Sequence, residues 1–214
     1  MQPNWAEENL QVIRTLMERA GLYRRALAPV MLALGVLGVI GWEVGKWFRM
    51  ESFESFTTLW FTIAAFAIAI ALLIIRRQAL NSVEPFWTGP TKRVAFAMLP
   101  PLTAGLMLVL VQFAARSSTG SSGGLEIGWP LLYGCALHSA GQFISRGVRL
   151  LGWGFISASV ALAYIQMHIA SGLDEKGKLP IWVQPNAMMG MTFGGLHLVA
   201  AAYLYFTEKP NPTP

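Results

Sequence analysis

Six long apolar runs divide the chain, and their length restricts the fold more than any other feature of the sequence. They cover residues 26–44, 57–75, 94–113, 129–144, 150–167 and 186–206, which is 16 to 21 residues each. An α-helix needs about 20 apolar residues to cross roughly 30 Å of hydrocarbon. Because lipid offers no partners for backbone N–H and C=O groups, such runs fold as helices in a bilayer. The sequence therefore predicts an all-α transmembrane bundle of six helices.

The composition agrees with a chain embedded in a membrane. Hydrophobic residues make up 54% of the 214 residues and charged residues 13%, about half the charged share of soluble domains. The formal net charge is +5, but the basic residues stand beside the apolar runs, where they act as topology signals. No glycine-rich phosphate loop, zinc finger or basic recognition helix accompanies them, which argues against a nucleic-acid partner.

The apolar runs separate three parts of the chain. In residues 1–25, the side chains Leu10, Ile13 and Met17 recur at three- and four-residue spacing, which predicts an amphipathic helix on the cytoplasmic membrane surface. A short solvated helix packed on the ends of the bundle fits the same pattern. Residues 26–206 are predicted to form the transmembrane domain, and residues 207–214 a short cytoplasmic tail.

The distribution of basic residues predicts the orientation in the membrane. With six crossings, eleven of the sixteen lysines and arginines fall on the side of both termini, and five fall on the other side. Loops on the cytoplasmic side of membrane proteins carry an excess of positive charge. Both termini are therefore predicted to be cytoplasmic. The first apolar run lacks a signal-peptide cleavage pattern and is expected to remain as a membrane anchor.

Small residues, a charge pair and a proline pair are expected to shape the helices. Gly41 and Gly45 form a small-xxx-small pair, which favours close approach of another helix. Glu43 and Lys46 stand three residues apart and are expected to pair across one helical turn. The adjacent prolines at 100 and 101 remove helix hydrogen bonds, so a kink is expected in the third span.

Two histidines are the main candidates for a functional site. His138 lies nine residues after Trp129, and His197 lies eleven residues after Asn186. At 1.5 Å per residue, both imidazoles are predicted near the middle of the bilayer and at similar depth. An ionisable side chain at that depth is a candidate for function.

Three interpretations of these histidines remain open. As two axial ligands, His138 and His197 would hold a haem b between the fourth and sixth spans. Cys135 shares a helix face with His138, and together with His197 they offer the donors of a copper or zinc site. In the third interpretation, both histidines are neutral and hydrogen-bonded to neighbouring helices, so they only stabilise the bundle.

Catalytic motifs are missing from the sequence. The six predicted spans contain no aspartate, and Glu43 is their only acid. No G-x-S-x-G or H-E-x-x-H motif is present. The leading hypothesis is therefore a non-enzymatic membrane component that acts through contacts with itself or with a partner protein. A small-solute transporter is a rival, although few polar residues are available to line a path.

Three segments carry a resemblance to known proteins. They are LMERAGLYRR before the first span, EPFWTGPTKR between the second and third, and MGMTFGGLHLV in the last. With these segments the chain resembles small, uncharacterised bacterial inner-membrane proteins with six spans. The resemblance covers most of the chain and implies a multi-pass protein of the bacterial inner membrane. No activity is established for that group, so the resemblance implies no catalytic residues.

Overall fold

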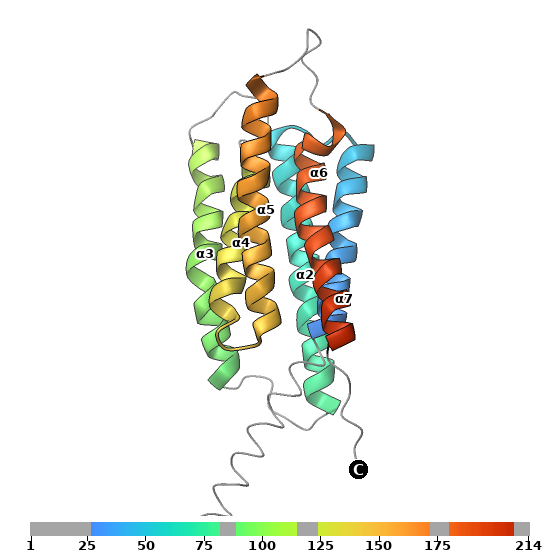
Figure 1. The fold of residues 1–214 in the computed structure, drawn as a ribbon, viewed down its shortest axis with the longest axis vertical. Coiled ribbons are helices and arrows are strands. Elements are labelled where there is room, and N and C mark those ends of the chain that lie inside the picture. Colours follow the sequence, from blue (N-terminus) through green and yellow to red (C-terminus); the bar gives the residue numbers. More distant parts are fainter. Residues whose placement is uncertain (1–26, 82–88, 115–123, 172–179, 208–214) are drawn as a thin grey trace, which may run out of the picture.

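The computed structural model describes residues 27–81, 89–114, 124–171 and 180–207, and all secondary structure in these ranges is helical (Figure 1). The elements are an N-terminal helix Leu27–Trp47, drawn in blue, followed by α2 (Phe53–Asn81), α3 (Gly89–Ala114), α4 (Leu125–Ala140), α5 (Arg146–Ser171), the 3₁₀ turn η1 (Ile181–Val183), α6 (Pro185–Met189), the π-helix η2 (Gly190–Gly195) and α7 (Leu196–Thr207). The predicted amphipathic segment and the tail after Thr207 lie outside the described residues.

Five of the helical segments are long and apolar enough to cross a membrane. They are the N-terminal helix, α2, α3, α5 and the continuous segment Pro185–Thr207, which unites α6, η2 and α7. The remaining predicted span, the fourth, corresponds to α4, which has 16 residues and a length of about 24 Å. Successive helices run in opposite directions, so the start of the N-terminal helix and the end of α7 lie at the same end of the bundle (Figure 1).

One group of helices consists of the N-terminal helix, α2 and the segment Pro185–Thr207, and glycines set its closest contact. A Cβ atom built on Gly38 would lie 2.5 Å from the backbone nitrogen of Gly194. One on Gly190 would lie 2.4 Å from the Cβ of Trp42. The N-terminal helix and the last segment are therefore packed backbone against backbone, as small residues allow in membranes. We call this contact the glycine seam.

The second group consists of α3, α4 and α5, and it also depends on glycines. A Cβ atom on Gly152 of α5 would lie 2.5 Å from the backbone nitrogen of His138 on α4. Gly134 of α4 faces the same contact, because its Cβ would lie 2.9 Å from the carbonyl oxygen of Gly152. These contacts let α4 and α5 form a tight antiparallel hairpin, with α3 packed on the other side of α4.

Side chains and local turns define several helix ends. The hydroxyl of Ser52 accepts a hydrogen bond from the backbone N–H of Ser55 at 3.2 Å, which caps the start of α2. The N-terminal helix ends where Arg49 adopts a φ of +50° and the N–H of Met50 bonds to the carbonyl of Gly45 at 2.9 Å. This left-handed turn closes the helix in the manner of a Schellman motif.

Asn186, at the start of the last segment, ties three parts of the first group together. Its side-chain oxygen accepts a hydrogen bond from Nε1 of Trp60 at 2.9 Å. Its amide donates to the carbonyl of Met50 at 2.8 Å. Gly45 leaves room for this amide, because an added Cβ would lie 2.5 Å from the Asn186 side chain. A buried carboxamide with both ends bonded fixes how deep the last segment sits beside α2.

The smaller sequence predictions can be compared with these contacts. The pairing of Glu43 with Lys46 is confirmed, with 3.9 Å between Oε2 and Nζ at an exposed position. Gly41 does not act together with Gly45, since it faces Trp60 of α2, whereas Gly45 faces the last segment. The two prolines lie inside α3, which continues through them over 26 residues.

Candidate functional site

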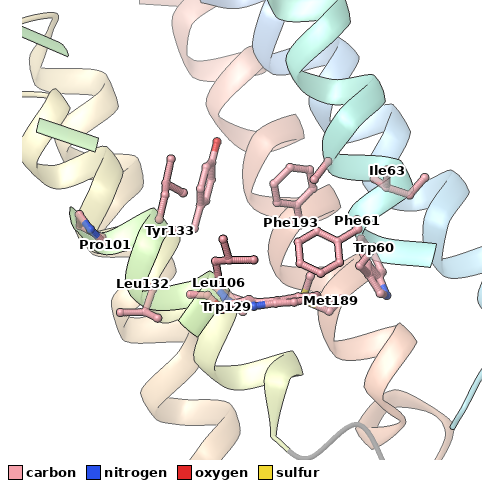
Figure 2. Close-up of a pocket in the computed structure, with 14 residues that line it drawn as sticks. Trp60, Phe61, Ile63, Pro101, Leu106, Trp129, Leu132, Tyr133, Met189 and Phe193 are labelled. Carbon is pink, nitrogen blue, oxygen red and sulfur yellow. Dashed lines mark hydrogen bonds between the residues drawn. The ribbon is translucent and has the colours of Figure 1, made fainter. Parts of the chain in front are cut away.

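A cavity of about 180 Å³ lies where the two helix groups meet (Figure 2). Side chains from α2, α3, α4 and the last segment line it: Trp60, Phe61, Ile63, Ala64, Pro101, Leu102, Gly105, Leu106, Trp129, Pro130, Leu132, Tyr133, Met189 and Phe193. Five of these are aromatic. The cavity is thus formed by four separate segments of the chain.

The polar edges of the two tryptophans in this wall are already bonded within the protein. Trp129 donates its Nε1–H to the carbonyl of Gly105 at 3.1 Å, and Trp60 donates to Asn186. The ring of Trp129 also stacks on Phe56 at 6.1 Å between centroids and meets the edge of Phe61 at 5.3 Å. Trp129 is therefore held in place, and what it presents to the cavity is apolar ring surface.

A buried hydrogen-bonded chain adjoins the cavity and links α4 to the last segment. His197 has no exposed surface. Its Nδ1 lies 2.6 Å from the carbonyl of Phe193, and its Nε2 lies 3.1 Å from the hydroxyl of Tyr133. A carbonyl only accepts, so Nδ1 carries the proton and Nε2 accepts the hydroxyl hydrogen of Tyr133. Both nitrogens of His197 are thereby satisfied by neutral partners.

The π-helix η2 explains why polar side chains gather at this point. A π-helical segment changes the backbone pairing within an α-helix, and such segments are frequent at functional sites. The hydroxyl of Thr192 donates to the carbonyl of Met188 at 2.8 Å, and His197 donates to Phe193. In a lipid environment, such bonds satisfy carbonyls that water does not reach.

Phe193 connects the cavity with the rest of the interior. Its ring packs against all three clusters of buried apolar residues. It also lies 5.5 Å from the ring of Tyr133 and 4.6 Å from that of His197. The wide turn of η2 thus places Phe193 between the two helix groups, with the glycine seam on the opposite side of the same turn.

The structure does not bring His138 to His197. The hydroxyl of Tyr133 reaches His197 instead, and His138 lies five residues after Tyr133, about 7.5 Å further along α4. α4 ends at Ala140, so His138 is close to the end of the helix. Its ring packs against Trp153, a half-exposed side chain on α5. Counted from Leu125 and Pro185, where their helices begin, His138 lies 13 residues along α4 and His197 lies 12 residues along the last segment, so the two histidines have different neighbours although they stand at similar positions along their helices.

The proposed metal ligands are also apart. Within the described residues, no group of three or more histidine, cysteine, aspartate or glutamate side chains is arranged to hold a metal ion. Cys135 is a half-buried free cysteine on α4. The structure therefore does not assemble Cys135, His138 and His197 as one ligand set, and coordination by His197 requires the loss of one of its two hydrogen bonds.

One buried ionisable residue was missed by the sequence analysis. Glu126 lies in the first turn of α4 and is almost completely buried. Its Oε1 accepts a hydrogen bond from Nε2 of Gln166 on α5 at 3.3 Å. The sequence did carry a signal, because Glu126 stands between the apolar residues Leu125 and Ile127. An acid at that position is compatible with the first turn of a helix, where the helix dipole favours negative charge.

No protein-family model, no curated protein and no solved structure matches the chain.

Proposed function

We propose that this protein is a non-enzymatic component of the bacterial inner membrane that acts through helix contacts with itself or with a partner protein. In this proposal the chain crosses the membrane six times, with α4 as the shortest crossing and both ends in the cytoplasm. The excess of basic residues near those ends supports the orientation. The resemblance to six-span inner-membrane proteins supports the location.

The observation that carries this proposal is the exposure of α3. In its most apolar stretch 11% of the residues are buried, against 50% in the last segment. Among the described elements, α3 packs extensively only on α4. Its outer side presents large apolar residues at helical spacing: Phe96, Leu99, Met107, Leu110 and Val111. We call these five residues the α3 face.

The interior supports a role in contacts rather than in catalysis. The buried hydrogen bonds of Asn186, Tyr133 and Glu126 each join one helical segment to another. They are typical of polar groups that hold membrane helices together. The walls of the cavity are apolar, and the one hydroxyl among the lining residues, that of Tyr133, is bonded to the buried His197.

Cysteine crosslinking in native membranes tests the contact role. In a Cys135→Ser background, we expect Leu99→Cys and Leu110→Cys to give a discrete crosslinked species with a bifunctional maleimide. Val199→Cys is the matched control, because Val199 is a large apolar residue exposed on α7. Mass spectrometry of the product then distinguishes a second copy from another protein. The absence of an adduct from every position on the α3 face contradicts the proposal.

A further inference from the structure

We propose that the cavity holds an acyl chain of a membrane phospholipid, which enters sideways between α2 and α3. The inference rests on the proposed membrane location and adds a ligand to it. The occupant is a hydrocarbon chain, and the phosphate head group stays outside at the membrane surface.

The cavity faces the region that lipid occupies. Three residues of its wall are themselves exposed on the outside of the bundle: Phe61 on α2, with 42% exposure, and Leu102 and Leu106 on α3, with 45% and 44%. Within the described parts of the two helices, α2 and α3 make no extended contact with each other. An opening between these helices therefore leads directly from the hydrocarbon of the bilayer to Trp129 and Phe193.

The size and rigidity of the cavity suit a stretch of chain. An apolar cavity of about 150 Å³ stays dry and binds benzene, and this one has about 180 Å³. Trp129 cannot move into the space without losing its hydrogen bond to Gly105 and its contacts with Phe56 and Phe61. An unfilled cavity would leave its wall without dispersion contacts on one side. A preformed apolar space is therefore available to the most abundant apolar chains around it.

The wall also argues against a ligand with a polar ring. The N–H groups of Trp60 and Trp129 and the hydroxyl hydrogen of Tyr133 are all bonded within the protein. The carbonyls of a quinone ring would be buried without a donor, which is unfavourable. A plain hydrocarbon chain loses no hydrogen bond when it enters, so it is the ligand class that this wall fits.

The position of the cavity selects one leaflet. Trp129 and Met189 each lie four residues after the start of their helices, or about 6 Å, and Tyr133 and Phe193 lie eight residues after it, or about 12 Å. α4 and α6 both start at the end of the bundle that is opposite Leu27 and Thr207, so all four residues lie in the half of the bundle nearer that end. In the proposed orientation, the bound acyl chain belongs to a lipid of the outer leaflet.

Photocrosslinking with a phospholipid that carries a diazirine in its acyl chain tests this inference. The protein is reconstituted in vesicles of bacterial phospholipids with this probe, and labelled peptides are identified by mass spectrometry. We expect label on the cavity wall in α2 and α3. Ala64→Phe places a ring in the cavity and should reduce this label at least fivefold. Ala65→Phe is the matched control, because Ala65 is the next exposed alanine and does not line the cavity.

A second variant keeps the test decisive if Ala64→Phe does not fold. Leu106→Ala widens the opening on α3 and should increase labelling of Trp129. Label that is no stronger in the cavity than at the lipid-facing Val199, or unchanged in both variants, overturns the inference. Preferential labelling by an isoprenoid probe of equal length also overturns it. If no part of the chain is labelled, Val199 included, the membrane location itself is wrong, so the two failures are distinguishable.

Discussion

Replacing Gly38 by leucine is expected to push the N-terminal helix away from the last segment and to destabilise the protein by about 3 kcal/mol, the upper part of the range for overpacking. The Cβ alone would lie 2.5 Å from the nitrogen and 2.6 Å from the Cα of Gly194. Both are backbone atoms of a helix, so no side chain can rotate away to make room. Gly38→Ala should already be destabilising, and Gly38→Leu more so.

The control for this prediction lies on the opposite helix. Nothing is within 4 Å of a Cβ atom built on Gly195, so Gly195→Ala should leave the stability within about 0.5 kcal/mol of the unsubstituted protein, as substitutions away from packed sites usually do. Unfolding of each variant in mixed micelles, measured by steric trapping, provides the free energies. Equal stability of Gly38→Ala and Gly195→Ala would show that the glycine seam does not exist.

Replacing His197 by leucine is expected to destabilise the protein by about 2–4 kcal/mol. The substitution leaves the hydroxyl of Tyr133 and the carbonyl of Phe193 buried without their partner, at about 1–3 kcal/mol for each such group. Tyr133→Phe removes one of the two bonds and should have the smaller effect. Tyr205→Phe is the matched control, since Tyr205 is 74% exposed on α7 and should change little.

A double-mutant cycle separates a structural role of His197 from cofactor binding. Interhelical hydrogen bonds in membranes have measured coupling energies of about 0.6 kcal/mol, with a maximum near 1.7 kcal/mol. We expect Tyr133→Phe and His197→Leu to couple within that range, with no change in the visible absorption spectrum. A Soret band that disappears in His197→Leu, with no coupling to Tyr133, would instead support the haem interpretation.

The sequence predicted which segments are helices better than it predicted where the helices end. The second span was expected at residues 57–75, whereas α2 extends from Phe53 to Asn81. The difference arises because hydropathy detects only the apolar centre of a helix. The cap at Ser52 starts α2 before its apolar stretch. The polar residues after Ile75 extend the helix without raising its hydropathy.

The error at the fourth span had the largest consequence for the candidate site. Placing its start at Trp129 left Glu126 outside the helix, so its burial and its hydrogen bond to Gln166 of α5 were missed. In the structure, α4 begins at Leu125, and Tyr133 rather than His138 bonds to His197. Spacing along a helix predicts depth, but it does not show which side chains of two helices face each other, so Tyr133 was not identified as the partner of His197.

The cavity was not predictable from the sequence at all. Its wall comes from four segments that are far apart in the chain, and their relative depth depends on contacts such as those of Gly38 and Asn186. The sequence did identify His197 as a candidate, and it lies in the segment MGMTFGGLHLV, which also contains the glycines at 190 and 194. It did not indicate that the glycines face the N-terminal helix while His197 faces α4, because the π-helical turn is not visible in a pattern of apolar residues.

The most direct test of the six-crossing arrangement is the position of the two ends of α4 relative to the membrane. In a Cys135→Ser background, single cysteines are introduced at Ser122, between α3 and α4, at Arg146, at the start of α5, and at Thr207. They are then treated with a membrane-impermeant maleimide in intact cells. We predict labelling of Ser122→Cys in intact cells, and labelling of Arg146→Cys and Thr207→Cys only after permeabilisation. Labelling of Ser122→Cys and Arg146→Cys from the same side would show that α4 does not cross and would contradict the arrangement.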